Sequence, residues 1–585
     1  MRRLATAYTT LALYAGLVVW LTWPLAAHLA SRLPDTRPEC RYDTLYMAWV
    51  LAHETHALTT APRDLLDTNI YHPARRTLFY GDTGFGILPY FLPTFLLTGS
   101  PTVAINVAFL GCIALTAAAL HLVVRRWTGS HLAGLVAAAT LLTDPWVLWE
   151  FIPTAPSYAV LLYLPVIVLL AETDAPFLAL LPLVVLQGLA DVVYVAPAVL
   201  TPLGVLALGR LVRPRTRTAG LRLLGVLALA MVALLPVYAG HFAVWAANPG
   251  LARQTVWQLR APPTALPWGP LVKGPTAIAP VALLLIMAGA ASIVPRILRH
   301  EAGWPRRAWA HGALWAFVGT LISITPNASW SGRAVALPQH LLAQWVPIYR
   351  TLRDPERLGV AALFGLAILA GLAFAECVRR VPDRGRARPL ATVAMAAGAL
   401  GAMYAGYGMG GGGRWAGSYR LAPAITGDSP LIPGLRAHGG PLLELPVGAV
   451  SGAHGSAAEL ALPALHARAM YRSIFHWRPL LNGYSGYWPS GFEQRMALAR
   501  RLPDGDALAT LRRDTGLDAI LVHLADFGGP EREVCGNRTG WCAQDFGAAD
   551  RAAWRAVAAG DAPGDIRLVA RDGDDLLFAV GPTRR

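Results

Sequence analysis

The feature that most constrains the fold is a series of long apolar stretches separated by short basic connections. A helix that crosses a bilayer needs about 20 mostly apolar residues, and eleven stretches approach or meet this requirement. They lie near residues 4–24, 101–124, 131–149, 157–172, 176–191, 194–212, 221–245, 275–295, 310–326, 358–377 and 389–409. The sequence therefore predicts an all-α membrane domain with about eleven transmembrane helices over residues 1–409.

Composition supports a membrane protein. Hydrophobic residues make up 55% of the 585 residues and charged residues 15%, whereas about 25% of the residues in an average soluble domain are charged. This excludes a disordered chain and a simple soluble enzyme. The net charge of +15 could indicate nucleic-acid binding, but the basic residues form short clusters between apolar stretches. We therefore expect no nucleic-acid partner.

The arginine clusters predict the orientation, because short cytoplasmic loops collect Arg and Lys. With eleven spans, the clusters at 2–3, 125–126, 210–222, 296–307 and 379–388 all fall on one side of the membrane. We expect a cytoplasmic N-terminus, a large first outer loop at 24–100 and an extracytoplasmic C-terminal part. This arrangement requires residues 83–100 to form an interfacial or re-entrant segment.

Residues 410–585 have the composition of a soluble α/β domain that follows a glycine linker, Gly410–Gly413. Apolar runs predict strands and amphipathic runs predict helices. The expected strands are 441–445, 518–523, 566–570 and 575–580, the last two forming a hairpin, and the expected helices are 493–501, 506–513 and 548–558.

Cys535 and Cys542 bracket a short polar loop in this domain. An oxidising compartment would allow a disulfide between them, and we predict that pairing. The alternative is that both cysteines are unpaired small residues. A zinc site is not expected, because further ligands at a suitable spacing are lacking.

The first outer loop carries the densest chemistry. Asp43 opens segment 43–58, in which Tyr46, Trp49 and His53 recur at helical spacing. We expect a helix on the membrane surface, with either a functional Asp43 or an Asp43 that only caps the helix. His53 and His56 fit packing roles better than metal ligation.

Several motifs resemble bacterial membrane glycosyltransferases of the GT-C superfamily. They are D-x-x-x-x-x-W-x-L from Asp43, N-I-Y-H-P at 69–73, R-D-P-E-R at 353–357, L-E-L-P at 443–446 and H-W-R-P-L-L-N-G-Y-S-G at 476–486. The resemblance covers nearly the whole chain, and the C-terminal elements are similar to a subfamily with an extracytoplasmic domain.

The resemblance implies an inverting sugar transfer in the bacterial inner (plasma) membrane, from a polyprenyl-phosphate donor to a glycan, lipid or protein acceptor on the outer face. It also implies that Asp43 is the catalytic carboxylate. A phosphate leaving group needs cations, and arginine binds phosphate in two places. The candidates are Arg75, Arg76, Arg350, Arg353 and Arg357. Their alternative role is ion pairing or contact with the membrane interface.

The first outer loop departs from better-known members because it lacks a strict D-x-D or E-x-D pair. Glu39 and Asp82 are the candidates for a second carboxylate, and the alternative for Asp82 is a turn residue. No cofactor is certain, and a divalent metal stays open because its several oxygen ligands would have to be brought together by folding.

The motif at 476–486 and the residues that follow it provide His476, Asn482, Tyr484, Tyr487 and Trp488. Their aromatic faces suit a sugar ring, so acceptor binding is one hypothesis. The alternative is a lid that packs on the membrane domain.

Two other classes of function compete with the enzyme. Asp144 and Asp191 are costly inside a membrane and could form the relay of a proton-coupled lipid or solute carrier. A noncatalytic scaffold for envelope polysaccharide assembly is the third reading.

Overall fold

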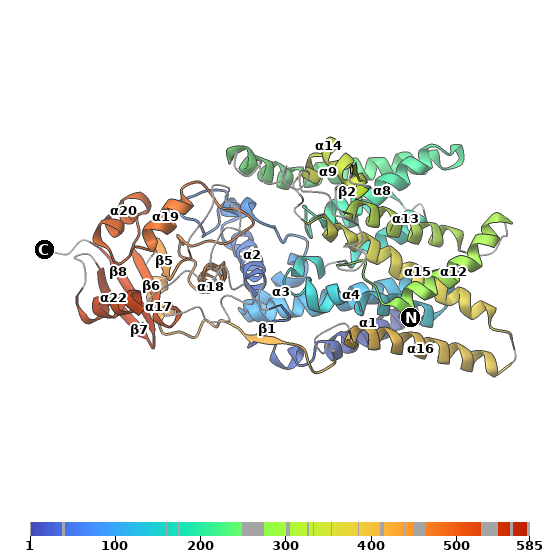
Figure 1. Ribbon diagram of the computed structural model, residues 1–585, viewed down its shortest axis with the longest axis horizontal. Coiled ribbons are helices and arrows are strands. Elements are labelled where there is room, and N and C mark those ends of the chain that lie inside the picture. The colour runs from blue at the N-terminus through green and yellow to red at the C-terminus, as the bar shows by residue number, and fades with distance from the viewer. Residues whose placement is uncertain are drawn as a thin grey trace.

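The computed structural model describes the chain except for residues 1, 38–40, 160, 174–175, 249–273, 300–304, 325–326, 331–332, 351, 353, 384, 410–414, 438, 449–462, 528–547, 562–565 and 582–585. Helices fill most of the length of the molecule, and a β-sheet lies at one end of the long axis (Figure 1). The C-terminal end of α15 (Val360–Arg380) and the start of α16 (Ala387–Met409) lie toward the opposite end.

Each of the eleven predicted stretches contains a helix. Besides α15 and α16 these are α1 (Arg2–Leu21), α4 (Pro101–Thr128), α5 (His131–Leu142), α6 (Tyr163–Glu172), α7 (Phe177–Gly188), α8 (Val195–Leu211), α9 (Arg217–Ala247), α12 (Pro280–Leu298) and α13 (Arg306–Ser323). Among the described residues, five helices are long and apolar enough to cross a membrane: Leu4–Leu21, Pro101–Thr128, Pro214–Ala247, Pro355–Arg380 and Ala387–Tyr407. The count of eleven spans stays a prediction.

The helix α15 is central, because 94% of its apolar stretch is buried inside the molecule. Glycines bring α15 and α13 together at backbone distance. A Cβ atom on Gly365 would lie 2.2 Å from the backbone nitrogen of Ala316, and one on Gly319 would lie 2.3 Å from that of Ala362. Small residues at such crossings allow helices to pack tightly where water supplies no driving force.

Residues 24–100, the first loop, contain the helices α2 (Arg41–Thr60) and α3 (Leu88–Thr98) and the short 3-10 helices η1 (Leu25–His28), η3 (Pro62–Asp64) and η4 (Thr77–Tyr80). The 11 residues of α3 extend over about 16 Å, whereas the hydrocarbon core of a bilayer is about 30 Å thick. The helices α5, α6 and α7, which lie in predicted spans, are of similar length, so the interfacial or re-entrant placement of 83–100 stays a prediction.

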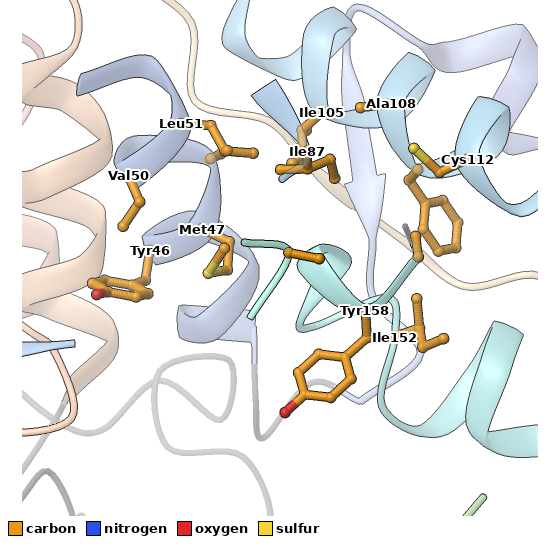
Figure 2. Packing of buried hydrophobic residues seen from close by; sticks show 14 of the residues in the cluster. Tyr46, Met47, Val50, Leu51, Ile87, Ile105, Ala108, Cys112, Ile152 and Tyr158 are labelled. Atoms are coloured by element: carbon orange, nitrogen blue, oxygen red, sulfur yellow. The ribbon is translucent and has the colours of Figure 1, made fainter. Parts of the chain in front are cut away.

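The prediction that α2 lies on a membrane surface is wrong. Residues 44–55 are all buried, because α18 (Pro463–Ser473) packs on α2 from one side and α3 and α4 pack on it from others (Figure 1). Figure 2 shows Met47 and Leu51 of α2 beside Ile87 and Ile105. A helix that is covered on every side needs no polar face.

The C-terminal sheet has the strand order β5–β6–β8–β7. The strand β5 (Leu442–Leu445) runs parallel to β6 (Ala519–His523), and β8 (Asp575–Val580) runs antiparallel to both β6 and β7 (Ile566–Asp572). The α-helices among the described residues of this part are α17 (Leu431–Ala437), α18, α19 (Phe492–Ala499), α20 (Gly505–Thr515) and α22 (Ala548–Ala559). The predicted strands and helices are present within two residues of their expected bounds.

Backbone hydrogen bonds join the first loop to this sheet. The N–H of Leu481 donates to the carbonyl of Leu442 at 2.9 Å, and the N–H of Leu442 donates to Pro479 at 2.8 Å. On the other side of this segment, Leu480 donates to Asn69 at 2.6 Å, His72 to Leu480 at 2.8 Å and Tyr71 to Asn482 at 3.0 Å. We call the bonds among residues 69–72, 479–482 and Leu442 the bridging ladder.

Two further strand pairs are short. The strands β1 (Arg32–Pro34) and β4 (Leu421–Pro423) are antiparallel and form a second tie between the first loop and the C-terminal part. The strands β2 (Asn327–Trp330) and β3 (Arg333–Ala336) form a hairpin that precedes α14 (Pro338–Trp345).

We predict that Asn482→Ala destabilises the protein. Asn482 is 1% exposed; its Oδ1 accepts from the backbone N–H of Glu444 at 2.8 Å, and its Nδ2 donates to the carbonyl of Glu444 at 2.9 Å. Each buried group left unpaired costs about 1–3 kcal/mol, so we expect a loss of about 2 kcal/mol or more. Thermal unfolding of the purified protein in detergent measures it. The exposed Asp64→Ala is the control, and equal melting temperatures for both variants would contradict the role of Asn482.

Candidate functional site

Asp43 lies in the first turn of α2, where the helix dipole favours a negative charge. The helix begins at Arg41, so Asp43 is not its N-cap residue. The alternative prediction, that Asp43 only caps the helix, is therefore wrong. Asp43 Oδ1 accepts a hydrogen bond of 2.7 Å from the hydroxyl of Tyr484. A carboxylate of the first loop therefore meets a side chain of the C-terminal motif.

Asp82 lies in a loop that packs on α2. The hydroxyl of Tyr46 donates to the backbone carbonyl of Asp82 at 3.3 Å, and the N–H of Gly84 donates to Glu54 Oε1 at 2.9 Å. Burial raises the pKa of Tyr46, and the charges of Asp82 and, more weakly, Asp43 act in the same direction. Tyr46 thus interacts with both aspartates.

A close backbone approach brings Asp82 near Asp191. The N–H of Gly86 donates to the carbonyl of Leu189 at 2.8 Å, and a Cβ atom on Gly86 would lie 2.3 Å from the backbone nitrogen of Ala190. Asp191 lies between α7 and α8 and is 2% exposed. The Asp191 carboxylate interacts electrostatically with Asp82.

Asp191 and Asp144 both cap turns. Asp191 Oδ1 accepts from the N–H groups of Val193 and Tyr194, both at 2.8 Å, and Asp144 Oδ1 accepts from the N–H of Trp146 at 2.9 Å. Such contacts are typical of aspartate in turns. They give each carboxylate a structural role that requires no proton relay.

Arg357 lies in the 3-10 helix η9 (Pro355–Gly359), directly before α15. Its guanidinium carbon lies 4.6 Å from the ring centre of Phe151 and 5.0 Å from that of Tyr194. It pairs with Asp354 at 2.8 Å, and 26% of its side chain is exposed. Two aromatic faces therefore hold the cation in place.

Tyr158, in the 3-10 helix η6 (Pro156–Ala159), connects these charged groups. Its hydroxyl interacts electrostatically with Asp191, Arg357 and Asp82. Figure 2 shows that the hydroxyl groups of Tyr46 and Tyr158 point away from the cluster of labelled apolar side chains.

The fold thus gathers charged groups from four separate segments, namely Asp43, Asp82, Asp191 and Arg357. Tyrosines lie between them, and α2 with its neighbours supplies an apolar support. A carboxylate can accept a proton from a hydroxyl, and a guanidinium can bind anionic oxygens. The arrangement can therefore serve a transfer reaction with an anionic leaving group.

The other predicted phosphate-binding arginines are either in the exposed part of the first loop or not described. Arg75 pairs with Asp67 at 3.3 Å and its side chain is 85% exposed, and the N–H of Arg76 donates to the same carboxylate at 2.6 Å. Arg353 lies outside the described residues, as do Glu39, Cys535 and Cys542, and the side chain of Arg350 is not described either.

The candidate residues in the C-terminal motif and directly after it divide into two groups. Asn482, Tyr484 and Tyr487 make contacts that join segments, since the N–H of Tyr487 donates to the carbonyl of Tyr80 at 3.0 Å. His476 and Trp488 bond locally: His476 Nδ1 accepts from the N–H of Arg478 at 3.1 Å, and Trp488 Nε1 donates to Glu493 at 3.1 Å. These local contacts favour a packing role for the second group.

The two α2 histidines also make packing contacts. His53 Nε2 lies 3.1 Å from the carbonyl of Leu65, and the ring of His56 stacks on Trp477 with centres 4.1 Å apart. Within the described part of the chain, no group of three or more His, Cys, Asp or Glu residues is arranged to hold a metal ion.

Sequence reasoning missed Glu54, Tyr158 and Tyr194. Glu54 lies between His53 and Thr55 in the sequence, so its charge becomes a signal only once the helix is known to be covered on all sides. Tyr158 and Tyr194 lie in mostly apolar surroundings in the sequence, and Arg357, with which both interact, is far away along the chain.

Comparisons with known proteins identify the fold. Arabinofuranosyltransferase AftD from Mycobacteria matches with a TM-score of 0.55 and 16% identity over 100% of this chain and 40% of that one. A mutant of AftD matches with a TM-score of 0.50 and 16% identity over 98% of this chain and 41% of that one. The oligosaccharyltransferase AglB from Archaeoglobus fulgidus, in complex with an inhibitory peptide and a dolichol-phosphate, gives a TM-score of 0.39 at 10% identity, over 89% of this chain and 69% of that one.

The matches to AftD show that this chain shares its fold with AftD, and the chain spans less than half the length of AftD. No protein-family model and no curated protein sequence matches the chain.

We predict that Glu54→Gln stabilises the protein increasingly as the pH rises. Burial raises the pKa of Glu54 from 4.5 to about 8. Between these values the unfolded chain ionises and the folded protein does not, so wild-type stability falls by up to about 1.4 kcal/mol per pH unit. Glutamine cannot ionise and can still accept from Gly84.

Melting temperatures of both proteins at pH 5, 6, 7 and 8 test this prediction. The melting temperature of Glu54→Gln minus that of the wild type should rise over this range. Any offset that the new amide adds does not change with pH. A difference that does not change with pH would contradict the protonated state of Glu54.

Proposed function

We propose that the protein is a membrane glycosyltransferase that moves a sugar from a polyprenyl-phosphate donor to a glycan, lipid or protein acceptor of the cell envelope. The observation that carries the proposal is the placement of Asp43 and Arg357 in one group of charged residues, connected through Tyr46, Asp82 and Tyr158. The fold shared with an arabinofuranosyltransferase supports sugar transfer as the chemistry.

In this proposal Asp43 is the general base. It takes the proton of an acceptor hydroxyl while the hydroxyl oxygen forms a bond to C1 of the sugar, which requires an approach of about 3 Å. The bond between C1 and the phosphate oxygen breaks, and its electron pair stays on the phosphate. Because the acceptor attacks the face opposite to the leaving group, the configuration at C1 inverts.

Arg357 is the cation best placed for the leaving phosphate. Its guanidinium is held between Phe151 and Tyr194, and its partner Asp354 is 43% exposed. A phosphate could replace Asp354 and bind the planar guanidinium at two points. Arg350 and Arg353 of the same segment, and the exposed Arg75 and Arg76, are further candidates.

The charged helix ends support the proposed orientation in a bacterial inner membrane. Arginines occupy the last turns of α4, α8, α12 and α15. The C-terminal end of α15 lies opposite to the sheet along the long axis (Figure 1). If arginine marks the cytoplasmic side, then the sheet, Asp43 and the acceptor lie outside.

We predict that Asp43→Asn folds and is nearly inactive. Asparagine has almost the same size and can still accept a hydrogen bond from Tyr484, so stability should change by no more than about 1 kcal/mol. Loss of a general base lowers the rate by about 10²- to 10⁴-fold. The assay incubates the purified protein with a panel of polyprenyl-phosphate sugars and measures donor consumption.

The matched controls are carboxylates of the same loop. Asp64→Asn, at an exposed position, should keep full activity, and Asp82→Asn should keep more activity than Asp43→Asn. If Asp82→Asn is the more damaged variant, Asp82 replaces Asp43 as the proposed base.

We also predict that the C-terminus lies outside the cytoplasm. A reporter that is active only in an oxidising compartment should be active when fused after Arg585 and silent when inserted near Arg384. The reverse pattern would overturn the orientation and the proposed location of the acceptor.

A further inference from the structure

The hydrogen bond from Tyr484 to Asp43 crosses between segments that lie far apart in the chain. The donor is a phenol of the C-terminal motif, the acceptor is Asp43 Oδ1 in the first turn of α2, and the distance is 2.7 Å. We infer that Tyr484 is a positioning residue for the Asp43 carboxylate, so that the C-terminal motif completes the catalytic site of the first loop. This inference rests on the proposed function.

The side chain of Tyr484 is held on several sides. It is 8% exposed, and its ring makes edge contacts with Tyr42 at 5.2 Å and Tyr46 at 5.7 Å between ring centres. Its backbone N–H lies 3.0 Å from the sulfur of Met470 in α18. A ring packed in this way has little freedom left to lose when its hydroxyl bonds to Asp43.

The segment that carries Tyr484 is anchored on both sides of it. The hydroxyl of Tyr71 lies 3.0 Å from Ser485 Oγ and donates to the carbonyl of Tyr487 at 3.1 Å. On the other side, a Cβ atom on Gly483 would lie 2.3 Å from the ring of Tyr71. The motif therefore cannot shift relative to the first loop without breaking buried contacts.

The same motif also supports the loop of Asp82. The N–H of Tyr487 donates to the carbonyl of Tyr80, two residues before Asp82. Tyr46, which touches the ring of Tyr484, donates to the backbone of Asp82. One short segment of the C-terminal part thus sets the positions of both Asp43 and Asp82.

The hydrogen bond has two chemical consequences. A donated hydrogen bond stabilises the ionised form of a carboxylate, which is the form that acts as a base. It also fixes the direction of Oδ1 and hence the plane of the carboxylate. A base whose plane is fixed spends less of its time in orientations that cannot take the proton.

The variant Tyr484→Phe tests the inference because it removes the hydroxyl and keeps the packed ring. We expect kcat to fall by about 10- to 100-fold with KM for the lipid donor nearly unchanged. The acid limb of the kcat profile should move by about one pH unit to higher pH, because the ionised carboxylate has lost a donor.

Tyr71→Phe is the matched control. It also removes a hydroxyl that joins the first loop to the C-terminal motif, but that hydroxyl donates to no carboxylate. It should leave the acid limb in place, whatever its effect on stability. A Tyr484→Phe enzyme with wild-type kcat, or with an unshifted acid limb like that of Tyr71→Phe, would overturn the positioning role.

A double-mutant cycle separates this inference from the proposed function. Melting temperatures of Tyr484→Phe, Asp43→Ala and the double variant should be non-additive if the two side chains interact. Additive effects would overturn the contact and with it the inference. Non-additive effects in a protein that consumes none of the donors would uphold the contact and count against the proposed function instead.

Discussion

The bridging ladder is the interaction on which the rest of the structure depends. It makes residues 69–72 of the first loop an extension of the C-terminal sheet through residues 479–482. Buried backbone groups must find partners, so the first loop cannot leave the sheet without exposing these bonds or leaving them unpaired. Through this ladder the C-terminal part becomes a structural support of the first loop. As a result α2 is an interior helix, with α18 on one side and α3 and α4 on others.

A buried ionic network supports the strand that carries the ladder. Glu444 of β5 accepts two hydrogen bonds from Arg472 of α18 and one from His523 of β6, whose other ring nitrogen lies 2.7 Å from Asp575. Burial raises the pKa of Glu444, but the charges and hydrogen bonds of Arg472 and His523 outweigh it and lower that pKa. Breaking such a pair by removing one partner is costly. The network therefore fixes α18 on the sheet, and α18 in turn covers α2.

The placement of the charged residues in the candidate site depends on close backbone contacts as much as on charge. Gly84 and Gly86 allow the loop of Asp82 to lie between α2 and the turn that carries Asp191, since a Cβ atom on either would meet neighbouring atoms within 2.4 Å. Arg357 reaches the same group from the end of a central helix. The ion pair and the aromatic contacts of Arg357 compensate for its partial loss of water.

The sequence by itself determined the helices in the eleven apolar stretches and the strands of the C-terminal sheet, because apolar runs and their period indicate the type of a buried element. It also indicated Asp43 and the motif near Tyr484 as chemically important. It did not indicate the helices α14, α17 and α18 or the short strands β1, β2, β3 and β4. Only the tertiary structure decided that these two residues touch, that α2 is buried on all sides, and that Glu54 and Tyr158 belong to the neighbourhood of the site. Those facts depend on contacts between segments hundreds of residues apart, and the local pattern of a chain carries no record of which distant segment will cover it.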